Sequence, residues 1–390
     1  MAEKVKPLKP KQRRLALRDP RLQPKEKDKR TPWWQRRKRE KVLTEEEAKR
    51  LFGDTMRTRN RAIRDLLPDP DQLRRYGLPP WETEEELAEA LKISLKEMRF
   101  YAIHRRAERY PHYVAFTLPK RSGGQRLIMA PKRRLKEIQR RLLGLLVRRL
   151  PGSDQSHGFR PGSSVKTAAE PHVGKRIVLH LDLQDFFHSV TFARVRGLLI
   201  ALGYGYPVAT ALAVLMTEAP RQPIEVEGTV YHVPVGHRRC VQGAPTSPGI
   251  CNTMALRLDR RLAGLARKFG FAYSRYVDDL IFSGDNPDLV NKLRHLVGQV
   301  VREEGFEVNR TKTRIFRSGG CQRVTGVVVN EVMGLSRQER RRLRSMIHRL
   351  KQGQAAGQPD DGRLAYLRGK LAYLAMLNPE QALPLKARMP

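Results

Sequence analysis

The sequence has 390 residues, of which 40% are hydrophobic and 7% aromatic, enough for two or three domains around a buried core. Its 77 lysines and arginines outnumber 40 acidic residues, and the formal charge of +37 indicates a nucleic-acid partner rather than an acidic membrane surface or a simply basic protein. No run of about 18 apolar residues could span a membrane, and three scattered cysteines (Cys240, Cys251, Cys321) exclude a disulfide framework or zinc site, so a cytoplasmic protein without a membrane partner is expected.

Residues 1–42 combine dense lysine and arginine with proline and little apolar periodicity, which predicts a basic flexible arm. Residues 43–109 carry helical patterns and are expected to form a helical N-terminal region, in which the proline-rich stretch 68–80 is interpreted as a linker. The helices expected in this region are Thr44–Leu67, Glu84–Leu91 and Ser94–Ala107.

From about residue 110 the pattern changes, because short runs of alternating apolar residues now separate the helical stretches. Strands interspersed with helices over 110–329, followed by helices alone over 330–390, predict an α+β fold with a helical appendage. The expected strands are Tyr113–Leu118, Arg126–Met129, Ile177–Leu183, Glu225–Val233, Ala272–Tyr276, Leu280–Ser283 and Arg323–Val329. The expected helices are Leu135–Leu150, Phe192–Leu202, Pro207–Thr217, Ser247–Phe269, Leu289–Glu304, Arg337–Lys351 and Arg363–Leu377.

The segment Arg275–Ser283 holds two adjacent aspartates, Asp278 and Asp279, between two apolar runs. Neighbouring side chains on a strand point to opposite faces, but a tight hairpin turn can bring both carboxylates to one site. Burying an acidic pair between apolar strands is costly unless cations offset the charge. On its own such a pair is more often a solvated turn, so the interpretation depends on further acidic residues.

A second acidic segment, His180–Phe187, places Asp182 at the end of an apolar strand. Beside the hairpin it would complete a cage of three carboxylates, which are hard oxygen ligands that suit Mg²⁺. Such a cage holds two ions about 4 Å apart, one activating an attacking hydroxyl and the other stabilising a leaving pyrophosphate. Asp185 competes for the ligand role, although its position beyond the strand favours contact with solvent.

Between the two acidic segments lies the polar loop Val241–Pro248, which leads into an expected helix. Gly243 permits close backbone approach, and Thr246 or Ser247 is a suitable helix cap. Alone, this loop is an ordinary capped turn, and only its neighbours suggest a function for it.

In this order the segments resemble the sequence blocks of reverse transcriptases. The resemblance runs from about Pro111 to Val329. It implies a right-hand polymerase fold with fingers and palm over 110–329, a helical thumb over 330–390, and RNA-directed DNA synthesis. The matching blocks are DLQDFF at 182–187, QGAPTSP at 242–248 and YVDD at 276–279, with the fingers hairpin at 119–127, the lysine block at 308–313 and the following strand at 319–329.

The resemblance also implies a role for each matching residue, although three of the cations could simply be surface charges (Lys120, Arg126, Lys312). The implied catalytic and metal-binding residues are Asp182, Asp278 and Asp279 with two Mg²⁺ ions, and Lys312 as a general acid near the leaving group. The implied nucleotide-binding residues are Lys120 and Arg126 on the dNTP triphosphate, Phe187 as the gate against a ribose 2′-hydroxyl, and Gln242 beside the incoming nucleotide.

Within that family the chain resembles retron enzymes, particularly the long myxobacterial type. Val324-Thr325-Gly326 matches their thumb-boundary signature, and residues 168–172 resemble their Asn-Ala-x-x-His block, with Ala168 in place of the asparagine. Arginines cluster over 337–349, where a helix could follow a phosphate backbone. The resemblance assigns RNA recognition to His172, Val324, Thr325 and Gly326, and the charge pattern adds Arg340 and Arg344.

A retron enzyme is expected to recognise a cognate structured non-coding RNA and to prime from a guanosine 2′-hydroxyl within it. It then makes short branched single-stranded DNA (msDNA), and the RNA–DNA product usually acts with an accessory defence protein against phage. Two alternatives stay open. One is another bacterial reverse transcriptase, either group II intron-like or defence-associated, and the other is a catalytically silent RNA-binding scaffold.

Overall fold

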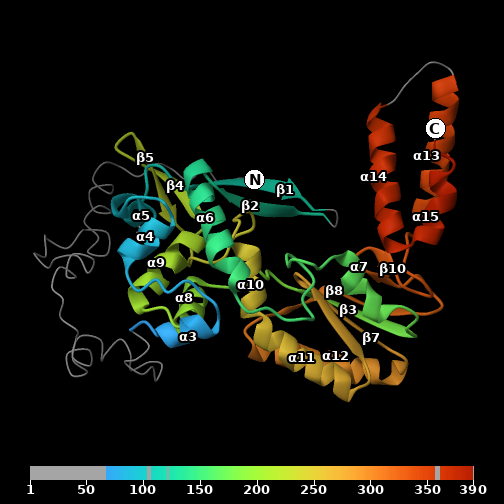
Figure 1. The fold of residues 1–390 in the computed structure, drawn as a ribbon, viewed down its shortest axis with the longest axis horizontal. Helices are drawn as coiled ribbons and strands as arrows, with labels where there is room; N and C mark the ends of the chain where they lie inside the picture. The colour runs from blue at the N-terminus through green and yellow to red at the C-terminus, as the bar shows by residue number, and fades with distance from the viewer. Residues whose placement is uncertain (1–66, 103–106, 121–122, 356–360, 390) are drawn as a thin grey trace, which may run out of the picture.

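In a computed structural model of the chain, residues 67–102, 107–120, 123–355 and 361–389 are described. The arm predicted at 1–42 and nearly all of the helix predicted at 44–67 lie outside these residues. A helical group lies at one end of the molecule, and at the other end helices rise above a sheet that has further helices beneath it (Figure 1). The names fingers, palm and thumb are kept below for the regions to which the resemblance assigns them.

The interpretation of residues 68–80 as a linker is wrong, because this stretch contains a helix that packs into the core. Asp69 caps that helix by accepting a hydrogen bond from the Gln72 amide at 2.9 Å, and Pro70 occupies the first helical position, where no N–H is needed. Leu73 of the helix is fully buried. The N-terminal helices are α3 (Pro70–Arg75), α4 (Glu84–Ala90) and α5 (Leu95–Ala102).

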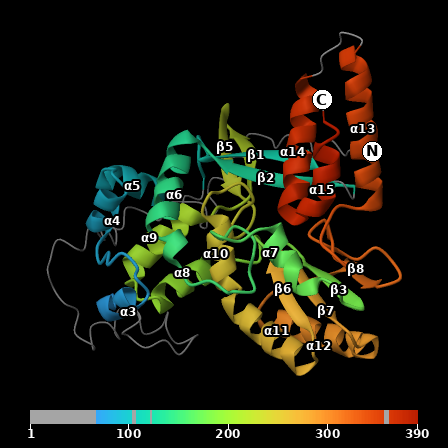
Figure 2. The ribbon, with the colours of Figure 1, turned by 45° about the vertical axis from the view of Figure 1, so that its right-hand side comes forward.

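The fingers region contains an antiparallel hairpin that extends from the helical group toward the thumb in both views (Figures 1 and 2). A second hairpin replaces the single strand expected over 225–233, since Glu227 and Gly228 both have positive φ and reverse the chain there. The elements of this region are β1 (Tyr113–Pro119), β2 (Gln125–Pro131), α6 (Arg133–Leu145), the 3₁₀ helix η3 (Val147–Arg149), α8 (Phe192–Ala201), α9 (Tyr206–Met216), β4 (Arg221–Val226) and β5 (Thr229–Pro234).

The palm is a four-stranded antiparallel sheet in the order β6-β7-β3-β8. Its continuous apolar strand β3 is almost wholly buried because two strands flank it and helices cover it. The helix expected over 247–269 is two helices that meet at Ala255, and β8 was not expected from the sequence. The elements are α7 (Val165–Ala169), η4 (Glu170–His172), β3 (Ile177–Leu183), α10 (Ser247–Met254), α11 (Leu256–Lys268), β6 (Ala272–Tyr276), β7 (Asp279–Gly284), η5 (Pro287–Leu289), α12 (Val290–Glu303) and β8 (Val308–Arg317).

The two faces of the palm sheet pack against different cores. Tyr273 and Phe282 lie on the face that joins the main core with α11 and α12, whereas Val178 and Ile281 belong to a second hydrophobic cluster. That second cluster continues into the thumb through residues such as Leu343. The thumb helices are therefore anchored to one particular face of the sheet (Figure 2).

The thumb begins after a tight turn rather than after the single strand expected over 323–329. Thr325 and Gly326 both have positive φ, which separates two very short strands. A third thumb helix was not expected from the sequence. The elements are β9 (Arg323–Val324), β10 (Val327–Val328), α13 (Arg337–Ala355), α14 (Asp361–Leu377) and α15 (Pro379–Lys386). Among the helices of the described ranges, none combines the length and apolar character needed to cross a membrane.

Candidate active site

The palm sheet gathers the three predicted carboxylates at one end. Asp182 on β3 is the register partner of Asp279 on β7, so the two side chains lie on the same face of adjacent strands. Asp278 occupies the turn between β6 and β7, and its carbonyl accepts a hydrogen bond from the Leu183 amide at 2.8 Å. Asp185 lies beyond β3 with its side chain 72% exposed, as expected from the sequence.

The surroundings of the Asp278 carboxyl group make it a weaker acid than an ordinary aspartate. The pKa of Asp278 is raised to about 6, first because the side chain is buried and then because Asp279 and Asp182 carry like charges nearby. A cation bound among them would relieve both effects. Together with the oxygen-only donor set, this repulsion fits a divalent metal site formed by the three aspartates.

A lysine and a histidine contact two of these carboxylates in the structure. The Lys312 ammonium on β8 lies 3.0 and 2.9 Å from the two carboxylate oxygens of Asp182, and this hydrogen bond raises the pKa of Lys312. His180 Nε2 lies 3.0 Å from Asp279 Oδ1. Across the described ranges, no three His, Cys, Asp or Glu side chains are already arranged to hold a metal ion. A divalent ion must therefore compete with Lys312 for Asp182.

Such an ion would supply charge neutralisation at an attacking hydroxyl and at a leaving pyrophosphate. The chain's own contribution is to hold Asp182 and Asp279 on adjacent strands and Asp278 in the turn beside them, and to keep the Lys312 ammonium within reach of the same position. A protonated lysine there can donate a proton to a departing phosphate oxygen.

The Val241–Pro248 loop is attached to the fingers hairpin. The Gln242 carbonyl accepts a hydrogen bond from the Met129 amide of β2 at 2.8 Å. Gly243 has φ +120°, and a Cβ there would lie 2.7 Å from the Met129 carbonyl oxygen, so only glycine allows this approach. Thr246 stands at the N-cap of α10 without a side-chain capping bond.

The other nucleotide-binding candidates lie after β3 and on the fingers hairpin. Phe187 is half-buried and packs edge-to-face on Phe186, with ring centroids 5.7 Å apart. Arg126 is exposed on β2 opposite Leu118, and Lys120 is exposed where the hairpin turns. Both cations are therefore on the surface of the hairpin, where an anionic ligand can reach them.

Direct RNA contact by His172 or Val324 is not compatible with this structure, because both side chains are fully buried. His172 bridges two serines, with Nδ1 2.6 Å from Ser283 Oγ and Nε2 2.8 Å from Ser274 Oγ. Burial lowers the pKa of His172 to about 3. Val324 packs in the cluster that joins thumb and palm. Both residues stabilise the fold instead.

The remaining RNA-recognition candidates reach the surface. Thr325 and Gly326 form the turn between β9 and β10. On α13, Arg340 is partly exposed and Arg344 is exposed one turn later. These two arginines therefore lie on the same side of the thumb helix.

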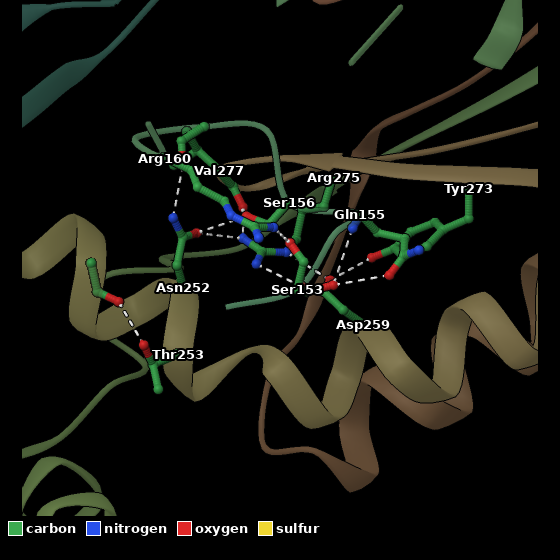
Figure 3. A network of polar contacts seen from close by, with 12 residues as sticks. Ser153, Gln155, Ser156, Arg160, Asn252, Thr253, Asp259, Tyr273, Arg275 and Val277 are labelled. Carbon is green, nitrogen blue, oxygen red and sulfur yellow. Dashed lines mark hydrogen bonds and ion pairs between the residues drawn. The ribbon is translucent and has the colours of Figure 1, made fainter. Parts of the chain in front are cut away.

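A buried polar network beneath the carboxylate turn was not expected from the sequence. Arg275 and Asp259 are both 0% exposed, and two of the guanidinium nitrogens lie 2.8 Å from the Asp259 carboxylate oxygens (Figure 3). The two residues lie on different elements, so no local spacing pattern could have paired them. No local signal marks this pair, because the helix that carries Asp259 also holds several other charged residues.

A palm sheet that gathers three carboxylates, beside a fingers hairpin and a helical thumb, defines a template-directed nucleic-acid polymerase. Residues 118–344 match the family described as reverse transcriptase (RNA-dependent DNA polymerase), and the chain belongs to that family. It is an RNA-directed DNA polymerase of the retron type, it binds an RNA template, and members of its family use divalent metal ions.

The similarity to retron enzymes extends over nearly the whole chain. The sequence is 61% identical to the retron Mx65 reverse transcriptase of Myxococcus xanthus, over 98% of this chain and 87% of that protein. It is 40% identical to the retron Mx162 reverse transcriptase of the same organism, over 82% and 69% of the two chains. It is 30% identical to the retron Ec86 reverse transcriptase of Escherichia coli, over 78% and 87%. The predicted family and α+β right-hand fold are confirmed.

Among solved structures, the chain is similar to telomerase from Candida albicans in complex with a telomeric RNA fragment. The TM-score is 0.42 with 12% sequence identity, over 65% of this chain and 50% of that chain.

Proposed function

We propose that this enzyme copies part of a cognate structured non-coding RNA into short single-stranded DNA, primed from a guanosine 2′-hydroxyl of the same RNA. The product would be msDNA, joined to its template RNA by a 2′,5′ branch. The observation that carries the polymerase chemistry is the gathering of three carboxylates at the β3–β7 register pair, where burial and then the like charges of Asp279 and Asp182 raise the pKa of Asp278. Full-length similarity to retron enzymes supports the choice of template and product.

In this proposal, Asp182, Asp278 and Asp279 hold two Mg²⁺ ions, and Lys312 protonates the leaving pyrophosphate. Phe187 excludes ribonucleotides sterically. The remaining nucleotide contacts are Lys120 and Arg126 on the triphosphate and Gln242 beside the base pair being formed.

The RNA would be held by exposed arginines of α13, including Arg340 and Arg344, and by the turn at Thr325 and Gly326. We further propose that the RNA–DNA product acts with an accessory protein in antiphage defence. Cys240, Cys251 and Cys321 are all free, which supports a reducing cytoplasm as the site of action.

The test is to express the gene with its native flanking DNA and to analyse the RNase-resistant nucleic acid from those cells. A discrete short single-stranded DNA with a branched RNA end should be present, and should disappear in the Asp278→Ala/Asp279→Ala double variant. Asp285→Ala is the matched control, because this exposed aspartate follows β7 and pairs with Lys175. Purified double variant should still bind the RNA.

Other outcomes would favour the alternatives. RNA-templated dNTP incorporation without branched DNA would indicate a group II intron-like or defence-associated reverse transcriptase. Branched DNA from the double variant would contradict the roles proposed for these two aspartates. Protection against phage by the double variant would instead favour a silent RNA-binding scaffold.

A further inference from the structure

One buried guanidinium contacts two of the sequence blocks that build the polymerase site, and also the helix that follows the third block. Arg275 lies on β6 and is fully buried, and its Nε and Nη2 donate to the two carboxylate oxygens of Asp259 on α11. This bidentate pair uses one edge of the guanidinium and fixes its plane. Burial by itself would lower the pKa of Arg275, but the Asp259 carboxylate more than offsets this, so the group stays charged. The third nitrogen, Nη1, is left to make other contacts.

Arg275 Nη1 reaches the carboxylate turn. It donates to the Val277 carbonyl at 2.9 Å and to Asn252 Oδ1 at 2.9 Å (Figure 3). Val277 is the residue directly before Asp278, whereas Asn252 lies on α10, the helix that follows the Gln242 loop. On another side, the guanidinium carbon lies 5.6 Å from the ring centroid of Phe186, which belongs to the Asp182 block.

The turn needs such support because its backbone is strained. Val277 is β-branched and has φ +59°, a left-handed conformation that branched residues rarely adopt. Residues held this way persist only where several contacts fix them. Here the Arg275 bond fixes the Val277 carbonyl, and the Leu183 amide fixes the Asp278 carbonyl next to it.

The segment that contains Gly158 packs against the same turn. Gly158 approaches so closely that a Cβ on it would lie 2.6 Å from Val277 Cγ2 and 2.9 Å from the Val277 amide nitrogen. Asn252 holds this segment, because its Nδ2 donates to the Gly158 carbonyl at 2.7 Å. Asn252 thus joins Arg275 and Gly158 on the two sides of Val277.

We infer that Arg275, oriented by Asp259 and linked through Asn252, is a positioning residue that holds Val277 in its left-handed conformation and thereby aims the Asp278 carboxylate at the metal site. Arg275 lies on the sheet face opposite Asp182 and Asp279, since side chains alternate along β6 and β7. It therefore acts through the turn and does not touch the substrate. This inference rests on the metal-binding role proposed for the three aspartates.

The test compares two variants that loosen the turn. Asn252→Ala, at a half-buried position, removes the oxygen that accepts from Arg275 and the amide nitrogen that donates to Gly158. Arg275→Lys keeps a positive charge near Asp259. A single ammonium, however, cannot contact Asp259 and the Val277 carbonyl at the same time, as the planar guanidinium does. With RNA template and dNTPs, we expect kcat to fall by about 10²-fold in each variant, with KM for dNTP and RNA affinity within twofold. Equilibrium Mn²⁺ binding, followed by EPR without nucleotide, should weaken by about tenfold.

The matched control is Tyr273→Phe. The Tyr273 hydroxyl donates to Asp259 Oδ1 at 2.8 Å, so its loss weakens the same buried network on the side away from the turn. We expect its thermal unfolding temperature to fall about as much as in Asn252→Ala, while kcat and Mn²⁺ affinity stay at the wild-type level. If Tyr273→Phe lowers kcat and Mn²⁺ affinity as much as Asn252→Ala does, these effects follow from lost stability and the inference is overturned.

The remaining outcomes separate this inference from the proposed function. If Arg275→Lys fails to fold, Asn252→Ala decides the question, since it leaves the Arg275–Asp259 pair intact. Folded Asn252→Ala with wild-type kcat and Mn²⁺ affinity overturns the positioning role alone. If Asp278→Ala/Asp279→Ala itself retains Mn²⁺ binding and DNA synthesis, the metal-binding role of the aspartates fails instead.

Discussion

At the scale of single residues, Lys312 decides how a metal ion gains access to Asp182. Its ammonium contacts both carboxylate oxygens, so it competes with a divalent ion for Asp182. In the proposed function the same ammonium gives a proton to the leaving group. We therefore expect Lys312→Ala to lower the Mg²⁺ concentration for half-maximal activity and to reduce kcat by about 10²-fold or more. Steady-state kinetics across a Mg²⁺ titration measure both. Lys292→Ala, on α12, is the control, and an increased Mg²⁺ requirement in Lys312→Ala would contradict the competition.

His172 gives a prediction for stability against pH. Its folded pKa of about 3 lies below the ordinary value of 6.5, so below pH 6.5 the unfolded chain binds a proton that the folded chain does not. Stability contributed by neutral His172 is therefore present above pH 6.5 and lost as pH falls toward 3. Between pH 7.5 and pH 5 this amounts to about 2 kcal/mol.

Urea unfolding of the wild type and His172→Gln at these two pH values measures that loss. Glutamine can bond to Ser274 and Ser283 but does not titrate, so the advantage of the wild type should shrink by about 2 kcal/mol at pH 5. A gap that is the same at both pH values would show that His172 titrates normally and is not buried as described.

The two classes of site residue differ in how visible they are in the sequence. Asp278 and Asp279 are neighbours in one short motif, so they can be identified from the sequence alone. Arg275 and Asp259 lie on a strand and a helix, and only the packed fold brings them together. The burial of His172 likewise depends on how η4 packs against β6 and β7, which no local pattern reveals.

At the scale of elements, the junction between β2 and the Gln242 loop depends on Gly243. An added Cβ would meet the Met129 carbonyl oxygen at 2.7 Å, in a backbone conformation that L-residues rarely adopt. We expect Gly243→Ala to destabilise the protein by about 1–3 kcal/mol and to raise KM for dNTP, because the loop must move away from the fingers hairpin. Chemical denaturation and steady-state kinetics measure these effects.

Gly264→Ala is the control for that change. Gly264 lies inside α11, and a Cβ added to it would meet nothing within 4 Å, so alanine should stabilise the helix by about 0.5–1 kcal/mol and leave KM unchanged. Equal stability of the Gly243→Ala variant and the wild type would contradict the close approach seen at Met129.

Most helices and strands were predicted correctly because their apolar periodicity is strong, but several points where the chain turns were not. The turn at Glu227 and Gly228 was overlooked because the flanking residues continue an alternating pattern across it. The helix at Pro70 was overlooked because proline was interpreted as a breaker, although it occupies the first helical position. The break at Ala255 has no local signal in the sequence.

At the scale of the whole molecule, the thumb and the carboxylates share one face of the palm sheet. Val178 and Ile281, which join the thumb's hydrophobic cluster, lie on the same side of β3 and β7 as Asp182 and Asp279, because side chains alternate along each strand. A thumb helix rich in arginine is thus anchored on the side of the sheet where nucleic acid would be copied. The formal charge of +37 is spread over several basic regions, and the next step is to determine which of them bind the RNA.

Two basic regions can be separated by the salt dependence of RNA binding. Each phosphate contact that is lost lowers the slope of log K against log salt by about 0.7–0.9. Arg340→Ala/Arg344→Ala should therefore reduce the slope by about 1.5. Deletion of residues 1–42, which are densely basic, should weaken binding more and flatten the slope further. Fluorescence anisotropy with the cognate RNA measures both, over a range of about 50 to 300 mM salt in which counterion release is resolved. Unchanged affinity and slope after the deletion would show that RNA is recognised by residues 43–390.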